Sequence, residues 1–233
     1  MLYSVVEPAV REAPTAMLSQ QLQRAITQAV AILQGGGVVA FPTDTLYGLG
    51  ASIFSTEGVR RVFQIKRRGA YQALPVLLSG LGDLGQVALE VPELAWKLAA
   101  RFWPGPLTLV VRKAATVPGL LTGGKETLAV RVPDHPVPIA LIRQLGTPIT
   151  GTSANRSGGP APRTAAGVRR QLGDAVELVI DGGTTPGDLP STIVEVTGPV
   201  AQVLRVGALP LERLHDLLQN ALEVVRGQEG ARA

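Results

Sequence analysis

Apolar and polar residues alternate along the chain with two different periods. Over residues 19–34 the apolar side chains recur every three or four positions, which is the spacing of a helix with one buried face. Ser19 is well suited to cap the start of this helix. The glycines at 35–37 end it, and the apolar run 38–41 then predicts a short buried strand.

The rest of the pattern continues this alternation. Further helices are predicted at 56–67, 92–102, 138–145, 164–172 and 211–225. Further strands are predicted at 75–78, 107–111, 128–132, 148–150, 176–180, 192–196 and 201–204. The last two strands are joined by a turn and are too close for a helical crossover. The sequence therefore predicts an α/β fold with a mixed sheet and helices packed on it.

Length and composition limit the organisation of the chain. With 233 residues, it is long enough for one domain with a complete core. We expect that domain at 19–209, with an N-terminal extension at 1–18 and a C-terminal helix and tail at 210–233. The sequence has no cysteine and two distant histidines, which excludes disulfides and thiolate metal sites and disfavours a zinc site.

Neither a leader nor a membrane span is indicated by the sequence. Its first residues lack a basic segment followed by an apolar run, and no stretch reaches about 18 apolar residues. We therefore expect a cytoplasmic protein without a membrane partner.

The chain is moderately basic, with a net charge of +4 and a pI near 9.8. Its basic residues occur in small scattered groups at 60–61, 66–68 and 169–170. Such groups fit either a solvated surface or a cleft that attracts anions. Because only four Phe, three Tyr and two Trp are present, a stacking platform for single-stranded nucleic acid is not indicated.

Two glycine-containing segments resemble nucleotide-binding loops without matching them. FPTDTLYGLG at 41–50 places hydroxyls, a carboxylate and two glycines after a predicted strand. Ile53 occupies the third glycine position of a dinucleotide fingerprint, and no tight helix follows. GLLTGGKE at 119–126 has Glu126 where a phosphate-binding loop requires Ser or Thr, so we expect a flexible loop there.

Several charged and hydroxyl residues stand at the ends of predicted elements. Residues 66–68 are basic and end a helix, where the helix dipole alone favours positive charge. Arg131 interrupts the apolar run of a strand, so it must face solvent or meet an anion in a cleft. The polar loop 151–159 offers N–H groups and hydroxyls to anions. His135 lies in a predicted loop and His215 on the C-terminal helix, so covalent catalysis is not indicated, whereas positioning and charge neutralisation suit adenylyl transfer.

Seven segments occur in an order that resembles the YrdC-like threonylcarbamoyl-adenylate synthase family: FPTDTLYGLG, KRR, WPGPLTLV, LAVRVPDHP, GTSANRSGGPAP, PSTIVEV and LRVG. The resemblance covers about 19–209, which would be the catalytic domain. It implies a YrdC-like twisted open mixed sheet, with helices packed on it, around a deep basic cavity. Because one helix follows LRVG, the chain resembles the short, single-domain bacterial type.

The resemblance implies a nucleotidyltransferase that makes threonylcarbamoyl-AMP. The expected substrates are L-threonine, bicarbonate and ATP, with magnesium bound through the ATP phosphates and no metal held by the protein. Threonine would be carboxylated on its amine, and the carbamate would attack the α-phosphate and release pyrophosphate. The product is expected to pass to a tRNA threonylcarbamoyl transferase complex for tRNA modification, and tRNA itself is a further candidate partner.

The resemblance also implies which residues form the site. The expected catalytic residues are Lys66, Arg68, Ser153 and Asn155. The residues expected to bind L-threonine are Thr45, Arg131, Gly151 and Ser191. The residues expected to bind ATP are Arg68, Gln72, Thr127, Ser153 and Arg205.

The chain departs from the family's pattern at three positions. Gly69 follows Arg68 where the family often has proline, Gln72 replaces a common asparagine or lysine, and Leu77 replaces a common histidine. The first two alter the surroundings of the phosphate contacts, and the third removes one expected threonine contact. Two alternatives therefore stay open: a YrdC-like RNA-binding module without this activity, and a paralogue acting on a different carbamoyl or adenylate substrate.

Overall fold

A computed structural model describes residues 18–67, 69, 72–187, 189–198, 200–218 and 222–223. The helices are α1 (Gln20–Gln34), α2 (Thr56–Lys66), α3 (Leu84–Val87), α4 (Glu93–Phe102), α5 (Gly119–Thr122), α6 (Pro136–Leu145), α7 (Ala165–Leu172) and α8 (Leu211–Leu218), with 3-10 turns at Leu81–Asp83 and Gly173–Ala175. The strands are β1 (Val39–Phe41), β2 (Gly48–Gly50), β3 (Val76–Leu77), β4 (Leu107–Arg112), β5 (Thr127–Arg131), β6 (Ile149–Thr150), β7 (Thr152–Ser153), β8 (Leu178–Val179), β9 (Thr192–Glu195), β10 (Ala201–Arg205) and β11 (Leu222–Glu223).

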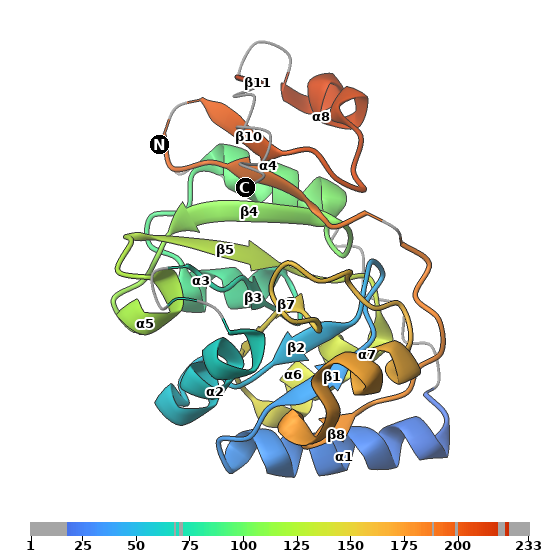
Figure 1. Cartoon of the computed structure of the whole chain (residues 1–233). Helices are drawn as coiled ribbons and strands as arrows, with labels where there is room; N and C mark the ends of the chain where they lie inside the picture. Colours follow the sequence, from blue (N-terminus) through green and yellow to red (C-terminus); the bar gives the residue numbers. More distant parts are fainter. Residues whose placement is uncertain are drawn as a thin grey trace.

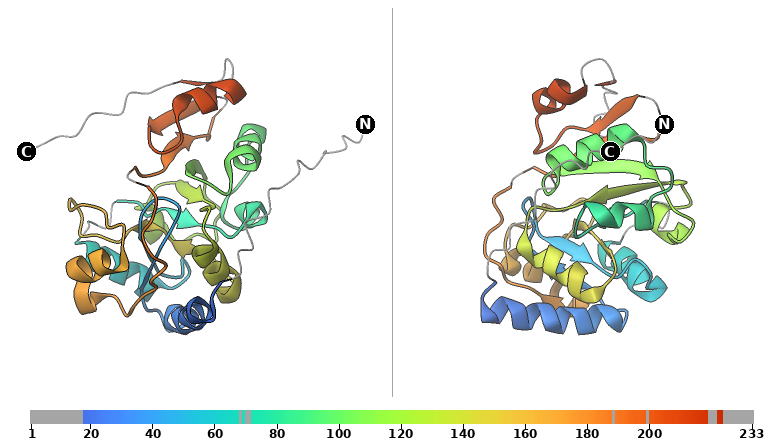
Figure 2. Two further views of the ribbon diagram at one scale, coloured as in Figure 1. Left: turned by 90° about the vertical axis from the view of Figure 1, so that its right-hand side faces the viewer. Right: turned by 180° about the vertical axis from the view of Figure 1, so that it is seen from behind.

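The strands form two sheets, one above the other in Figure 1. The lower sheet has the order β7-β2-β1-β8, and the upper sheet has the order β11-β10-β9-β4-β5-β3-β6. Both are mixed, because β1 is antiparallel to β2 but parallel to β8, and β4 is antiparallel to β5 but parallel to β9. α1 runs beneath the lower sheet, and α4 and α6 lie on the back of the molecule (Figure 2). The predicted mixed α/β fold is confirmed, although the strands form two sheets.

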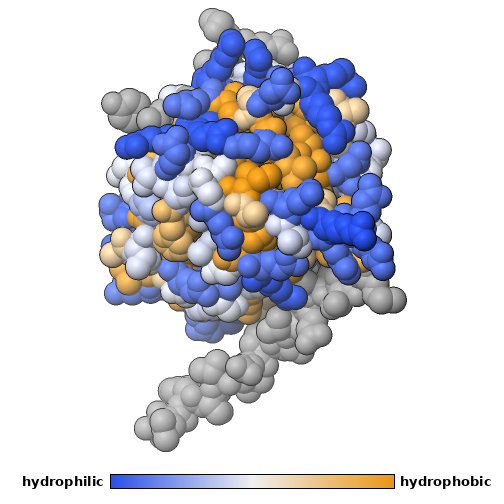
Figure 3. Space-filling model, turned by 90° about the horizontal axis from the view of Figure 1, so that it is seen from below, coloured by the Kyte–Doolittle hydropathy of each residue, from blue (hydrophilic) through white to orange (hydrophobic). Residues whose placement is uncertain are grey.

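Two hydrophobic clusters hold these layers together. The larger cluster joins β4, β5, β9 and β10 to α2 and α4. The smaller cluster packs Ile26, Ala29 and Leu33 of α1 against β1 and α6. These three residues have the predicted helical spacing, and Ser19 Oγ accepts a backbone N–H of the first turn at 3.3 Å, so the first helix and its cap are confirmed. Seen from below, apolar residues lie among polar ones on the face that carries α1 (Figure 3).

The lower sheet contains two strands that the sequence pattern does not predict. β2 includes Gly48 and Gly50, and β7 lies in the polar loop after β6; glycine and small polar residues disfavour strands. The ring of Phe41 explains the two glycines, because a Cβ added at Gly48 or Gly50 would lie 2.8 or 2.7 Å from it. Close packing of β2 against the Phe41 ring of the neighbouring strand β1 thus overrides the local propensity of β2.

The predictions for two other segments, 119–126 and 211–225, are wrong over part of their length. Residues 119–122 form α5 rather than a flexible loop, and Leu121 and Thr122 in it are fully buried. The predicted helix at 211–225 is confirmed at Leu211–Leu218 (α8) but wrong at Leu222–Glu223, which form β11 and pair in parallel with β10. Residues 219–221 and 224–225 lie outside the described residues. Free backbone groups at the edge of β10 make this pairing available, and helical periodicity carries no information about them.

Candidate active site

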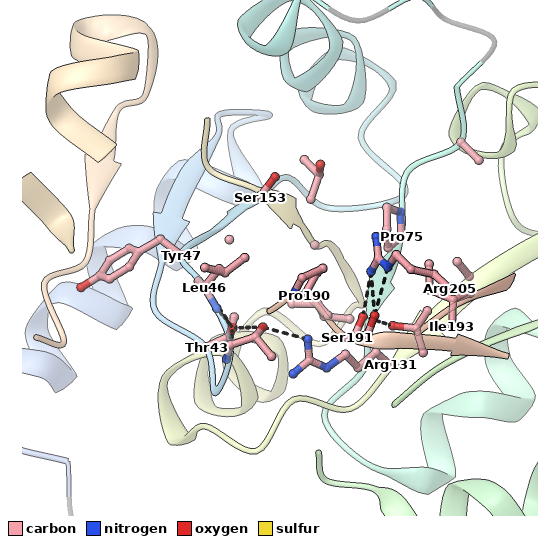
Figure 4. A pocket seen from close by; sticks show the side chains of 18 residues that line it. Thr43, Leu46, Tyr47, Pro75, Arg131, Ser153, Pro190, Ser191, Ile193 and Arg205 are labelled. Carbon is pink, nitrogen blue, oxygen red and sulfur yellow. Dashed lines mark hydrogen bonds between the residues drawn. The ribbon is translucent and has the colours of Figure 1, made fainter. Parts of the chain in front are cut away.

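A cavity of about 360 Å³ lies between the two sheets. Figure 4 shows the 18 residues that line it. They come from the loop before β2, from β3, β4 and β5, from the segment that holds β7, and from residues 190–193 with Arg205. Among these described residues none is acidic, whereas Arg131 and Arg205 are cationic. The cavity wall therefore favours an anionic ligand.

Arg131 is held at the end of β5 by three groups of the chain. The residue is only 6% exposed. Its Nε donates to the Gly105 carbonyl (2.9 Å), its Nη1 to Thr45 Oγ1 (3.1 Å) and its Nη2 to Asp44 Oδ1 (2.5 Å). The sequence allows Arg131 either to face solvent or to meet an anion in a cleft. In the structure Arg131 is buried and pairs with an anion, the carboxylate of Asp44. Since a guanidinium has five N–H groups, one N–H on each terminal nitrogen remains for a ligand.

Arg205 reaches the same cavity because β10 contains a bulge. The register between β10 and β9 shifts after Val203. As a result Arg205, rather than Leu204, lies opposite Ile193 on the cavity side. In regular pairing Leu204 would face the cavity, and Arg205 would point to the other side of the sheet. The bulge therefore gives the cavity its second positive charge.

Arg205 contacts only neutral oxygens of the described chain. Its Nε and Nη2 donate to the Ser191 carbonyl (3.1 and 2.8 Å), and Nη2 also donates to Ser191 Oγ (3.3 Å). Ser191 Oγ shares a 2.7 Å hydrogen bond with Thr108 Oγ1. Arg205 as a whole residue is exposed, but the cavity walls shield its guanidinium from water. This desolvation lowers the pKa of Arg205, and the positive charge of Arg131 lowers that pKa further. An anion between the two guanidinium groups would relieve their repulsion.

Lys66, Ser153 and Asn155 form a polar cluster beside the cavity. Lys66 Nζ donates to the carbonyls of Ser153 (2.6 Å) and Asn155 (2.9 Å) and to Asn155 Oδ1 (3.0 Å). Ser153 Oγ donates to the same Oδ1 at 2.6 Å, and Asn155 Nδ2 donates to the Gly159 carbonyl at 2.5 Å. Ser153 lines the cavity, whereas Lys66 and Asn155 do not. Lys66, which is 3% exposed, therefore supports the 153–155 loop from behind.

The residues expected to bind threonine all line the cavity: Thr45, Arg131, Gly151 and Ser191. Gly151 packs directly on Leu77, so that a Cβ added to this glycine would lie 2.4 Å from Leu77 Cγ. Leu77 itself is 3% exposed and also lines the cavity. The position where the family often has histidine is therefore an apolar part of the wall.

The residues expected to bind ATP are only partly brought together. Ser153 and Arg205 line the cavity. Thr127 lies on the same face of β5 as Arg131, at the opposite end of the strand. Gln72 is exposed and does not line the cavity, and Arg68 lies outside the described residues.

Sequence reasoning missed Asp44, Thr43 and Thr108. Asp44 compensates the charge of Arg131, but the two stand 87 positions apart, and no local pattern pairs them. Thr43 Oγ1 lies 3.0 Å from Thr45 Oγ1, and Thr108 is hydrogen-bonded to Ser191. The one available signal was the combination of a carboxylate in FPTDT with an arginine inside an apolar strand.

His135 lies next to this ion pair and caps α6. Its Nδ1 accepts the backbone N–H of Val137 at 3.2 Å. Burial lowers the pKa of His135 below its ordinary value of 6.5, and the charge of Asp44 partly opposes this shift. The folded protein thus favours the neutral imidazole that can accept this hydrogen bond.

Acidification is therefore expected to destabilise the fold through His135. Because the folded-state pKa is lowered, the unfolded state binds more protons once the pH falls to about 6.5, and stability is lost from there down to the lowered pKa. His135→Asn keeps a capping acceptor without titrating, so its thermal midpoint should fall less than that of the unaltered protein between about pH 7.5 and about pH 5.5. His215→Asn, at the exposed second histidine, is the control. An equal fall in both variants would contradict this prediction.

A protein-family model described as telomere recombination, Sua5/YciO/YrdC, matches residues 31–207. The chain belongs to this family. A threonylcarbamoyl-AMP synthase of Pyrococcus abyssi is 42% identical over 82% of this chain and 56% of the relative. One of Bacillus subtilis is 38% identical over 83% of this chain and 56% of the relative. The chain thus spans slightly more than half the length of these two Sua5/YciO/YrdC relatives. A putative threonylcarbamoyl-AMP synthase of Mycobacterium tuberculosis is 38% identical over 85% of this chain and 91% of the relative.

Solved structures of the Sua5/YciO/YrdC family have the same fold. The crystal structure of P. abyssi Sua5 complexed with L-threonine matches with a TM-score of 0.84 and 39% identity, over 89% of this chain and 62% of that chain. The crystal structure of Escherichia coli YciO matches with a TM-score of 0.74 and 30% identity, over 82% of this chain and 92% of that chain. In the part of the chain that the structure describes, no helix has the length and apolar character needed to span a bilayer.

Proposed function

We propose that this chain is a threonylcarbamoyl-AMP synthase, which converts L-threonine, bicarbonate and ATP into threonylcarbamoyl-AMP, pyrophosphate and water. The P. abyssi and B. subtilis relatives carry this name, and the P. abyssi structure contains L-threonine. The observation that carries the proposal is the presence of Arg131 and Arg205 in one cavity, each with a buried hydroxyl beside it. Such a cavity suits a carboxylate at one end and a phosphate at the other.

The Arg131 end is assigned to threonine. The two remaining N–H groups of Arg131 can meet the α-carboxylate. Thr43 donates its single hydroxyl proton to the Leu46 carbonyl (2.7 Å), so Thr45 must be the donor in the contact between the two threonines. Thr45 Oγ1 also accepts from Arg131, and its other lone pair is then available to a donor on the ligand, such as the amine or the side-chain hydroxyl.

The Arg205 end is assigned to ATP. Within the described residues Nη1 of Arg205 makes no hydrogen bond, so its two N–H groups can meet phosphate oxygens. Ser153 adds a hydroxyl at the same cavity, and Thr127 lies on the same face of β5 as Ala129, which lines the cavity. Arg68 and Gln72 are also proposed to contact the nucleotide, and these two assignments rest only on the family resemblance.

Lys66, Ser153 and Asn155 are proposed to support the reacting groups. The carbamate oxygen would attack the α-phosphorus while pyrophosphate leaves, and this step depends on positioning and on neutralising charge. Lys66 acts through the loop whose oxygens it binds, and Ser153 presents its hydroxyl to the cavity.

Replacing Lys66 by methionine is expected to reduce turnover more than substrate binding. The change removes hydrogen bonds to a charged group, worth about 1.5–3 kcal/mol each, and releases the loop that carries Ser153. We expect kcat to fall by roughly 10- to 100-fold, with KM for threonine and ATP changing by less than about threefold. Lys97→Met is the control, because this lysine forms an exposed pair with Glu93 on α4. An unchanged kcat in Lys66→Met would refute the assignment.

Magnesium is proposed to enter with ATP. The resemblance implies that the ATP phosphates supply its ligands. Among the described residues no group of three or more His, Cys, Asp or Glu side chains could hold a metal ion. A cytoplasmic location, delivery of the product to a tRNA-modifying transferase complex, and direct contact with tRNA are further parts of the proposal that rest on the resemblance.

Pyrophosphate release tests the proposed function. The protein is incubated with ATP, magnesium and bicarbonate, and each amino acid is added in turn. Release that depends on threonine supports the synthase. Release with a different substrate indicates a paralogue of altered specificity, and no release together with salt-sensitive RNA binding indicates an RNA-binding module.

A further inference from the structure

We propose that Asp44 is a positioning residue that divides the cavity into an amino-acid end and a phosphate end. Its carboxylate neutralises Arg131, so that this end favours a zwitterion, whereas uncompensated Arg205 favours a polyanion. The inference rests on the proposed function and deepens it, because it names the residue that separates the two substrates.

The Asp44–Arg131 pair is built into the wall of the cavity. The side chain of Asp44 is 13% exposed and that of Arg131 is 8% exposed. At such depth the interaction of two charges is stronger than on the surface. Asp44 does not belong to the residues lining the cavity, so its carboxylate lies behind the guanidinium and acts on a ligand through it.

Arg205 provides the contrast in the same cavity. Its hydrogen bonds go to the carbonyl and hydroxyl of Ser191, and no carboxylate within the described residues pairs with it. Desolvation and the charge of Arg131 both lower the pKa of Arg205, in agreement with its lack of a carboxylate partner among the described residues. Of the two arginines, Arg205 is therefore the stronger site for a multiply charged anion.

The charge balance at each end decides which ligand is stable there. Arg131 and Asp44 together are neutral, and a zwitterionic amino acid leaves this end neutral. A phosphate bound to Arg131 would bring about two negative charges to a guanidinium that the Asp44 carboxylate already neutralises, and the like charges would repel each other. His135, whose pKa is influenced by the Asp44 charge, is favoured in its neutral form and does not offset this repulsion. Asp44 thus rejects phosphate from the amino-acid end, which is discrimination by an unfavourable contact.

Asp44→Asn tests this assignment, with inorganic phosphate as the probe. The amide keeps the shape and an acceptor for Arg131 but removes the negative charge. We expect phosphate to inhibit competitively against threonine about tenfold more strongly, while KM for ATP changes by less than about threefold. Glu90→Gln, which neutralises the exposed partner of Arg112, is the matched control and should change none of these values.

A second measurement decides the question if Asp44→Asn does not fold, since an unpaired buried charge is destabilising. Calorimetry compares phosphate and threonine binding by the unaltered protein and by Arg205→Gln. We expect Arg205→Gln to bind phosphate about tenfold more weakly and threonine within about threefold of the unaltered protein. Undiminished phosphate binding by Arg205→Gln would place phosphate at Arg131 and overturn the inference.

The outcomes separate the inference from the proposed function. Unchanged phosphate competition in an active Asp44→Asn variant overturns only the sorting role of Asp44. Absence of threonine-dependent pyrophosphate release by the unaltered protein overturns the proposed function and the inference together.

Discussion

Replacing Arg131 by alanine is expected to lower kcat/KM for threonine by about 100- to 1,000-fold, with a much smaller effect on KM for ATP. Removing one preorganised hydrogen-bond donor from an active site typically raises the free energy of the transition state by about 2.7–4 kcal/mol. The effect is large here because the guanidinium is fixed by Gly105, Thr45 and Asp44 before any ligand arrives. Steady-state kinetics, with one substrate varied while the other is saturating, measure both parameters.

Two variants serve as controls for Arg131→Ala. Arg131→Lys keeps the charge but loses the planar fork of donors, so its activity should be intermediate. Arg112→Ala removes an exposed arginine of β4 and should leave the kinetics unchanged. Since Arg131→Ala leaves Asp44 buried without its partner, thermal unfolding must show that the variant is folded at the assay temperature. An equal rise of KM for threonine and for ATP would contradict the assignment of Arg131.

Replacing Gly207 by alanine is expected to lower the thermal midpoint by about 5–10 °C and to reduce kcat/KM for ATP. An added Cβ would lie 2.2 Å from the Pro190 carbonyl oxygen and 2.6 Å from the Ser191 carbonyl carbon. These are backbone atoms, so the clash must displace the wall that holds Ser191 and Arg205. Overpacking of this kind typically lowers the free energy of unfolding by about 1–3 kcal/mol. For a domain of this size, each kcal/mol lowers the thermal midpoint by roughly 2–4 °C.

Gly85→Ala is the matched control for Gly207→Ala. No heavy atom lies within 4 Å of a Cβ added at Gly85, which is in α3. Alanine is favoured over glycine in a helix by about 1 kcal/mol, so this variant should be as stable as the unaltered protein or slightly more stable. Calorimetric unfolding of both variants measures the difference. Equal midpoints for the two variants would show that the wall at Pro190 and Ser191 accommodates the extra atom.

The sequence by itself determined most of the regular elements. α1, α2, α4, α6 and α7 were all predicted within a few residues, as were the strands β4, β5, β9 and β10. Their periods are local, because a buried face repeats every three to four residues in a helix and every two in a strand. Order along the chain was also sufficient for the family resemblance, since its segments can be recognised without knowing how they pack.

Only the tertiary structure decided how the site is built. The ring of Phe41 leaves no room for a Cβ at Gly48 or Gly50 in β2, a bulge at Leu204 turns Arg205 into the cavity, and Asp44 meets Arg131 across 87 positions. Asp44 and Arg131 are far apart in the chain, and the other two features depend on how one strand packs against its neighbour. Periodicity and propensity describe a residue's surroundings along the chain, whereas the charge of this cavity depends on which distant side chains share it.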